Sequence, residues 1–481
     1  MSGGGLRSRL LQGSAYLIVR RGIGLVVSLG GMLLLTRLIG AGAYGSYATI
    51  TIVLGYATDL CINGTGAYLI RADEETAKKR FDLAFTYLAA VTAVTAALGC
   101  ALAGVVSGWF HQPGTERALA LSMLTIVPNA YTVPAMAQLE RELRYRSVAY
   151  IEMYAQIAYY ATALGLACLG FGLWAPVCGG LAQSAVIAAL CARFSRYWPS
   201  FWWNAAQFKE MFGYGIGHTA SMRVIGLRPV LGALIVSRFA GAEAVAFVSL
   251  VGRLADSLGF VGAAIQRMTF SFLARIRQEP GEVEKAMNGM LLAQVLSVAP
   301  LLVGFSVCAP WALTLLFGPG WAPVLSLYPY RAAVCIAACL FSVHVQILYV
   351  LGRNKDVVGI NLLHIALFAG AAAAFVPHAG LAGYAAAEAV SIASYFACDA
   401  PIRRLYRLRY RDALLCAAVC VPPLFFPIAP RPEAYLLFVP PLIYALVPGT
   451  RRKLARLAGE WTRARSRRRG APESAQAALP P

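Results

Sequence analysis

Seven arginines lie inside long apolar stretches of this 481-residue chain, where a permanent positive charge is costly. They are Arg20, Arg21, Arg223, Arg228, Arg253, Arg267 and Arg331. If these stretches cross a membrane, each charge at a helix centre costs about 2.5–3.5 kcal/mol, and the sum exceeds the net stability of a typical fold. The guanidinium groups must therefore face water, protein or a bound anion. Because a guanidinium fork matches the oxygen atoms of phosphates, the chemistry indicated is recognition of an anion.

Helical geometry places some of these charges on shared faces. At 100° per residue, Asp256 and Arg267 both lie within about 60° of Arg253 around the helix axis. Arginines outnumber the acids within the apolar stretches, which predicts a cavity of positive potential suited to an anionic substrate. We expect six arginines to line this substrate-binding cavity and to meet a pyrophosphate or a similar anion: Arg20, Arg21, Arg223, Arg228, Arg253 and Arg267.

A structural role is the alternative for each charge. Arg253 could pair with Asp256, since oppositely charged residues three positions apart on a helix commonly interact. Four arginines lie toward helix ends, from which a long side chain can reach the headgroup region: Arg20, Arg21, Arg267 and Arg331. The remaining arginines are harder to explain in this way, and they favour the cavity.

Three acids within the apolar stretches are candidates for coupling to a proton or cation gradient. They are Asp59, Asp256 and Glu388. Burial raises the pKa of a carboxyl group, and a neighbouring arginine counters that effect. The alternative is that each acid forms a hydrogen bond to a neighbouring helix.

Residue sets for catalysis or metal binding do not stand out. Cys335 and Cys339, like Cys416 and Cys420, are one helical turn apart, but no His, Asp or Glu close by in sequence completes a tetrahedral site. We interpret these cysteines as small packing residues. No Ser, His and Asp set stands out in a connection either. We therefore expect no enzyme activity, no metal and no cofactor.

The composition indicates the elements that must position these residues. The chain is 59% hydrophobic and 13% charged, with a mean hydropathy of +0.63, whereas a soluble domain carries about 25% charged residues. These values predict an all-α polytopic membrane protein of about fourteen transmembrane helices. The expected spans are 14–36, 46–70, 82–110, 118–138, 148–170, 173–192, 211–236, 243–272, 287–316, 323–350, 356–376, 380–400, 413–429 and 434–447.

The connections between these spans alternate in charge. One set, with the two termini, holds 31 Lys and Arg, whereas the other set holds only four: Arg37, Arg117, Arg238 and Arg431. Positive residues accumulate on the cytoplasmic side, so both termini are predicted to lie in the cytoplasm. We interpret the formal charge of +20 as basic residues that face anionic lipid at the cytoplasmic surface of the membrane. We therefore expect no nucleic-acid partner. The first apolar run lacks a small-residue cleavage site and is interpreted as a retained helix.

Short motifs repeat about 200 residues apart. Residues 36–41 (TRLIGA) match residues 237–242 (SRFAGA), and residues 172–175 (GLWA) correspond to residues 380–383 (GLAG). Two six-helix lobes in the same orientation follow, with a cavity between them. We predict an N-terminal lobe over 1–200, a C-terminal lobe over 201–411, two further helices over 412–450, and a basic, partly disordered cytoplasmic tail over 451–481.

A resemblance rests on three of these stretches. Residues 35–47 (LTRLIGAGAYGSY), residues 139–145 (LERELRY) and the turn at 172–175 resemble polysaccharide flippases of the Wzx type. That polysaccharide transporter family shares a superfamily with lipid II flippases and multidrug exporters. The similarity covers roughly the first twelve spans. The family's usual Gly-Pro-Glu-like outer turn is replaced here by Gly40-Ala41-Gly42, a departure expected to affect the rigidity of the turn.

The resemblance implies a two-lobed transporter of the bacterial inner membrane that alternates between inward-open and outward-open states. Its substrate would be an undecaprenyl-pyrophosphate-linked oligosaccharide repeat unit for exopolysaccharide, capsule or O-antigen synthesis, with an ion gradient resetting the cycle. Membrane lipids, a polysaccharide polymerase and the chain-length machinery are the implied partners. A multidrug exporter of the same superfamily is the first alternative. A membrane glycosyltransferase or ligase is the second, although the expected outer loops are short.

Overall fold

The computed structural model describes residues 3–71, 77–112, 114–276, 278–403 and 405–447. For residues 3–26 and a few later positions, among them His218 and Arg267, it describes the backbone alone. The predicted tail over 451–481 lies outside the described residues. Within them the secondary structure is helical, without a strand. The all-helical membrane fold expected from the composition is thereby confirmed.

Sixteen α-helices follow one another along the described chain. They are α1 (Gly3–Ile62), α2 (Thr65–Ile70), α3 (Ala77–Trp109), α4 (Glu116–Met123), α5 (Asn129–Arg141), α6 (Tyr145–Cys168), α7 (Trp174–Phe194), α8 (Ala205–Leu258), α9 (Phe260–Ile276), α10 (Pro280–Phe317), α11 (Pro323–Val350), α12 (Asn354–Ser391), α13 (Ala393–Phe396), α14 (Asp399–Arg403), α15 (Arg411–Leu424) and α16 (Val439–Leu446). Short 3-10 turns lie at Leu124–Ile126, Pro319–Trp321 and Glu433–Phe438.

Single glycines bend the longest helices back on themselves. Gly40 in α1 and Gly241 in α8 have φ values of 78° and 86°, a left-handed backbone that glycine adopts without steric cost. Each therefore joins two predicted spans without a loop. Gly172 and Gly380, at the other repeated motif, likewise share φ values of 49° and 50°. The repeated sequence motifs thus have matching backbone turns.

Eight helical stretches of the described chain are long and apolar enough to cross a membrane. Three of them contain a glycine turn, at Gly40, Gly241 and Gly380, and so hold two predicted spans each. The number fourteen stays a prediction. The expected span 118–138 is interrupted where α4 passes through a 3-10 turn into α5, next to Pro128.

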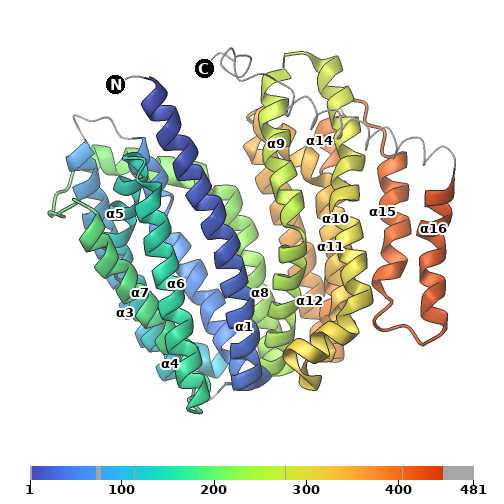
Figure 1. Cartoon of the computed structure of the whole chain (residues 1–481), viewed down its shortest axis with the longest axis horizontal. Helices are drawn as coiled ribbons and strands as arrows, with labels where there is room; N and C mark the ends of the chain where they lie inside the picture. The colour runs from blue at the N-terminus through green and yellow to red at the C-terminus, as the bar shows by residue number, and fades with distance from the viewer. Residues whose placement is uncertain (1–2, 72–76, 113, 277, 404, 448–481) are drawn as a thin grey trace.

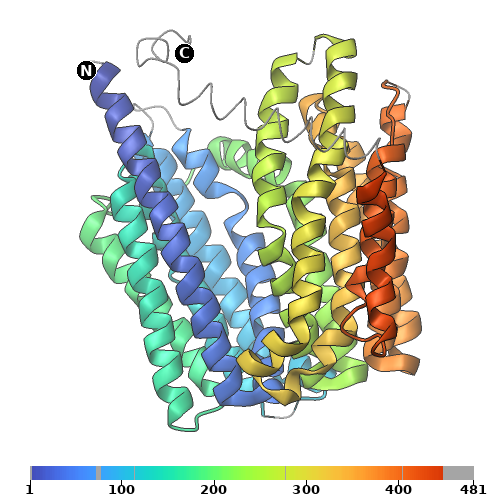
Figure 2. The same ribbon diagram turned by 45° about the vertical axis from the view of Figure 1, so that its right-hand side comes forward.

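The helices gather on two sides of a central pair. α1 and α8 pack against each other in the middle of the molecule, with α2–α7 on one side and α9–α14 on the other (Figure 1). Helices α15 and α16 lie at the flank beyond α10 and α11, and α16 ends toward the end of the molecule where α1 begins (Figure 2). The two predicted lobes, which would include α1 and α8 respectively, and their boundaries stay a prediction.

The largest apolar core lies within the second group. It is built from α9–α12, α14 and α15, with Leu291, Val295, Tyr328 and Val343 fully enclosed. A second core joins α1 and α8 near their glycine turns, where the Tyr44 ring lies 5.9 Å from that of Trp321. Large apolar side chains such as Val105, Leu315 and Leu442 remain exposed on the perimeter, as expected of surfaces that face lipid.

Candidate substrate-binding site

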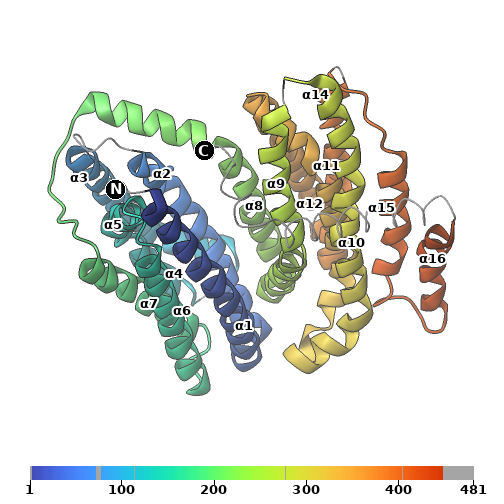
Figure 3. The ribbon, with the colours of Figure 1, turned by 45° about the horizontal axis from the view of Figure 1, so that its top comes forward.

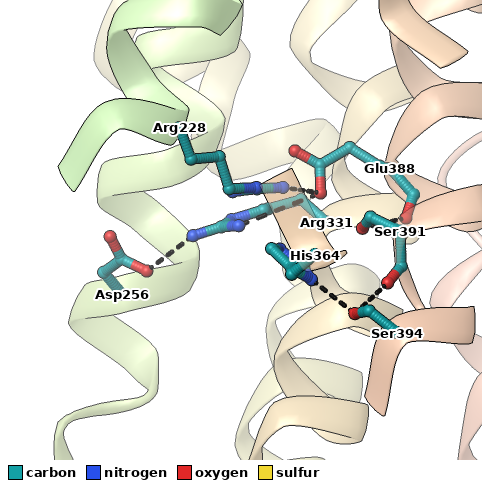
Figure 4. Close-up of polar contacts among 7 residues, drawn as sticks. All are labelled: Arg228, Asp256, Arg331, His364, Glu388, Ser391 and Ser394. Atoms are coloured by element: carbon teal, nitrogen blue, oxygen red, sulfur yellow. Dashed lines mark hydrogen bonds and ion pairs between the residues drawn. The ribbon is translucent and has the colours of Figure 1, made fainter. Parts of the chain in front are cut away.

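A buried network of charges joins α8, α11 and α12. Glu388 of α12 is 1% exposed, and its Oε2 atom accepts a hydrogen bond from Arg228 of α8 at 2.6 Å. Arg331 of α11 lies 3.8 Å from the same oxygen and donates to Oδ1 of Asp256 at 3.0 Å (Figure 4). Two arginines therefore meet two acids, and the network is electrically balanced.

Helix prolines adjoin both arginines of this network. Pro229 follows Arg228 directly within α8, and Pro329 precedes Arg331 by two positions within α11. A proline inside a helix removes one backbone hydrogen bond and bends the axis. The Arg228 guanidinium also stacks over the Phe368 ring, 4.5 Å from its centroid. Such a desolvated cation–π contact contributes about 2 kcal/mol or more.

Each arginine of the network has a hydrogen-bond donor that is not used. Within the described chain, Nε of Arg228 and Nε of Arg331 are buried without a hydrogen-bond partner. A small cavity of about 140 Å³ adjoins them, and Asp256 and Tyr384 also line it. Asp256 has 68% of its side chain exposed, so its bond to Arg331 is the accessible one of the network. An arriving anion could compete with Asp256 for that guanidinium.

A larger cavity of about 490 Å³ lies between α1, α6, α7 and α8. Arg253 of α8 enters it, and its NH1 atom lies 3.8 Å from the sulfur of Met32. Polar side chains of the opposite helices complete the lining: Ser28, Tyr44, Tyr47, Glu152, Gln156, Tyr159, Tyr160 and Gln183. Arg253 forms no ion pair with a carboxylate of the described residues, Glu152 included. Its charge is thus available to a ligand.

The tyrosines of this cavity are held in place by hydrogen bonds. The hydroxyl groups of Tyr47 and Tyr159 lie 2.8 Å apart, and the Tyr160 hydroxyl donates to the Ser28 carbonyl at 2.9 Å. These bonds tie α6 to α1. An arginine facing several ordered hydroxyl and amide groups can hold a ligand that carries both an anionic group and alcohol groups.

Asp59 and Arg223 line a third cavity, of about 290 Å³. Arg223 donates to the side-chain oxygen of Asn63 at 2.5 Å, where α1 and α2 meet the first half of α8. The helices approach closely there, because a Cβ atom on Gly215 would lie 1.9 Å from the Asn63 carbonyl oxygen. This contact connects α8 to the end of α1, and it occupies one nitrogen of Arg223, whereas the Nε atom of Arg223 is buried without a hydrogen-bond partner in the described chain.

The predicted site residues thus divide among three places. Arg228, Asp256 and Glu388 come together in the buried network, Arg253 enters the largest cavity, and Arg223 lies beside Asp59. The side chains of Arg20, Arg21 and Arg267 lie outside the described residues, although their backbones are helical. Four of the seven arginines have described side chains, against the three acids Asp59, Asp256 and Glu388, so most of the expected positive excess would have to come from the other three arginines.

Two expectations need correction. Asp256 pairs with Arg331 of α11 and not with Arg253 of its own helix. Arg331, expected to reach toward the headgroups, instead points into the network with 18% of its side chain exposed. Arg331 lies within an apolar stretch, as Arg228 does, so its charge is equally costly there. That cost could have identified Arg331 as a site residue from the sequence.

A buried histidine beside the network was also missed. His364 of α12 is 4% exposed, and its Nδ1 atom lies 2.8 Å from the hydroxyl oxygen of Ser394 (Figure 4). Ser394 in turn donates to the Ser391 carbonyl at 2.6 Å. The joint from α12 to α13 is thereby fixed below Glu388. Nothing in the sequence distinguished this histidine from a packing residue.

Comparisons with known proteins identify one family and one fold. Residues 34–326 match the family described as "Polysaccharide biosynthesis protein". The teichuronic acid biosynthesis protein TuaB of Bacillus subtilis (strain 168) is 23% identical over 297 residues, and the match spans 60% of this chain and 60% of that protein.

Solved structures share the fold. Lipid II flippase MurJ in an inward closed conformation superimposes with a TM-score of 0.68 at 10% identity, over 88% of this chain and 96% of that one. A multidrug resistance MATE family transporter in an inward-facing conformation gives a TM-score of 0.58 at 15% identity, over 81% and 98% of the two chains. At these identities the likeness concerns the fold alone.

Proposed function

The chain belongs to the polysaccharide biosynthesis protein family, and from that membership we propose that it moves a lipid-linked oligosaccharide from one leaflet of the membrane to the other. The substrate class we propose is an undecaprenyl-pyrophosphate-linked repeat unit of the bacterial inner membrane. The protein would be a transporter and not an enzyme. Its fold is shared with a protein named as a lipid II flippase, and a fold of this kind is compatible with the movement of a whole lipid.

One observation carries the proposal: Arg253 enters the 490 Å³ cavity without a carboxylate partner in the described chain. A guanidinium without a carboxylate partner is a strong receptor for a phosphate group. The tyrosines and glutamines around it offer hydrogen-bond donors and acceptors to sugar hydroxyls. A pyrophosphate with the first sugar attached combines these two chemistries.

The buried network would act as the second part of the site. Asp256 is exposed and holds one donor of Arg331, so a pyrophosphate oxygen could displace it. Glu388 would keep both arginines in place throughout, because it is buried between them. Asp256, once released, and Asp59 are the acids we propose for coupling to a cation or proton gradient.

Complementation of a bacterial strain that lacks its own polysaccharide flippase tests this function. The wild-type chain should restore surface polymer and clear the lipid-linked repeat unit that accumulates on the cytoplasmic leaflet. Arg253→Ala should lower the transport rate by about 10–100-fold at an unchanged membrane level, since a hydrogen bond to a charged group contributes about 1.5–3 kcal/mol. Arg253→Lys should retain part of the rate, because it keeps the charge and loses the fork.

Arg117→Ala is the matched control, because Arg117 is exposed near the start of α4 and lines none of the three cavities. It should transport at the wild-type rate. Normal polymer output from Arg253→Ala would remove Arg253 from the site. Failure of the wild-type chain to complement, together with export of an organic cation from vesicles, would favour the multidrug alternative.

A further inference from the structure

A separate polar cavity lies away from the central charges, where α3, α5 and the connection from α7 to α8 meet. Its volume is about 360 Å³, and Lys78, Arg141 and Arg196 line it together with Gln138, Tyr197 and Trp198. Figure 3 shows this connection as a loop beside the bundle. Of the residues that the structure describes, three cations and no acid therefore face this space.

A buried carboxylate fixes the segment that forms one wall of this cavity. Asp82 of α3 is 4% exposed and accepts hydrogen bonds from the Tyr197 hydroxyl at 3.1 Å, the Ser200 amide at 3.1 Å and the Ser200 hydroxyl at 2.6 Å. The Trp202 amide donates to the Thr86 hydroxyl at 3.0 Å. Burial and the nearby Asp82 raise the pKa of Tyr197, so its hydroxyl remains a donor at neutral pH. These hydrogen bonds hold the connection from α7 to α8 in an ordered conformation against α3.

Within the described part of the chain, the three cations are not neutralised by ion pairs. Among the described residues, none of Lys78, Arg141 and Arg196 forms an ion pair with a carboxylate. Asp82 lies behind the wall with its oxygens occupied by Tyr197 and Ser200. Like charges placed around one cavity repel each other, and a bound anion relieves that repulsion.

Exposed aromatic rings mark the level of the cavity in a membrane. Trp198 is 84% exposed, Phe201 78% and Trp203 53%. Tryptophan collects at the membrane–water interface, with its ring at the height of the lipid headgroups. The cavity therefore opens where the phosphates of phospholipids lie, on the face that the positive charges predict to be cytoplasmic.

We propose that Lys78, Arg141 and Arg196 bind the phosphate of an anionic phospholipid, while Trp198 packs against its glycerol and upper acyl chain. The arginine forks contact phosphate oxygens directly, and Lys78 adds a compact charge. A zwitterionic lipid such as phosphatidylethanolamine would bind more weakly, because its ammonium group adds a positive charge to a site that already holds three. This site is independent of transport, and its test does not rely on the proposed function.

Native mass spectrometry of the purified full-length chain in detergent tests the site. The protein is titrated with phosphatidylglycerol, phosphatidylethanolamine and, in a separate arm, inorganic phosphate. The wild-type chain should bind one phosphatidylglycerol in clear preference to phosphatidylethanolamine. The triple variant Lys78→Gln, Arg141→Gln, Arg196→Gln should bind it on the order of a hundredfold more weakly, since each basic residue at an anionic headgroup contributes about fivefold. Trp198→Ala should weaken the lipid several-fold.

A control variant removes the same charge from nearby residues that do not line the cavity: Lys79→Gln, Arg193→Gln, Lys209→Gln. It should keep phosphatidylglycerol affinity within about threefold of the wild type. Equal loss in this control, or retained affinity in the Lys78, Arg141 and Arg196 variant, would overturn the site. Displacement of the lipid by an equal concentration of inorganic phosphate would assign the cavity to a free anion and overturn the lipid assignment.

Discussion

At the scale of single residues, the central charges are ordered by partners that lie far apart in sequence. Arg228 and Glu388 are separated by 160 positions, and Arg331 and Asp256 by 75. Helical periodicity relates residues of one helix only, so it could predict that these charges need partners but not which ones. Arg253 and Asp256 do lie three positions apart on α8, but Asp256 pairs with Arg331 of the neighbouring helix α11.

Glu388→Gln should destabilise the fold strongly. Removing one partner of a buried pair leaves an uncompensated charge, which costs about 3–5 kcal/mol. Arg228 and Arg331 would both lose their shared carboxylate oxygen. Thermal unfolding of the purified protein in detergent measures the loss. The double variant Arg228→Met, Glu388→Met should be the more stable of the two, because it removes both charges together.

Asp256→Asn serves as the matched control for that experiment, because Asp256 is exposed and Arg331 keeps Glu388 nearby. Its unfolding temperature should stay close to that of the wild type. If Glu388→Gln and Asp256→Asn unfold at the same temperature, the buried pair does not stabilise this fold.

At the scale of the helices, the predicted spans located most of the apolar segments but not how they join. A loop was expected between 14–36 and 46–70, whereas α1 continues through both and bends only at Gly40. Hydropathy reports which residues tolerate lipid, and a single glycine with positive φ leaves no hydropathy signal. The expected span 118–138 corresponds to the single apolar stretch Glu116–Arg141, within which a 3-10 turn joins α4 to α5 and leaves no hydropathy signal.

Gly45→Ala should disturb the contact between α1 and α8. A Cβ atom at Gly45 would lie 1.8 Å from the backbone oxygen of Ala242, so the helices must separate. Overpacking of this kind costs about 1–3 kcal/mol, and the unfolding temperature and the transport rate should both fall. Gly42→Ala, three positions earlier, meets only the flexible Glu243 side chain at 3.8 Å and should behave like the wild type. Equal behaviour of the two variants would contradict the close helix contact.

At the scale of the whole molecule, the composition and the repeated motifs predicted a helical membrane protein with two groups of helices, and the family resemblance implied a transporter. The family match confirms the recognition made from three short stretches. An arginine-lined cavity was predicted but its walls were not, because they come from helices such as α1, α6 and α8 that no local pattern brings together.

Reporter fusions should test the predicted orientation of the chain. Alkaline phosphatase, which is active only outside the cytoplasm, should be active when fused after Gly114 or Gly172 and inactive after Asn204 or Gly352. The last two sites adjoin basic residues, which are retained in the cytoplasm. Green fluorescent protein at the same four sites should give the opposite pattern. Active phosphatase after Asn204 would reverse the assignment of the phospholipid cavity to the cytoplasmic leaflet.

The glycine turns at Gly40 and Gly241 have a consequence for the surroundings of the protein. Because α1 and α8 reverse direction within one residue, that end of the central pair presents almost no protruding chain. A neighbouring protein approaching from that side would find the two helix turns and the short α3–α4 connection, which packs against Ser237, but no long loop of α1 or α8. Any machinery that receives the cargo there would have to meet the transporter sideways within the bilayer, or collect a product that has already diffused away.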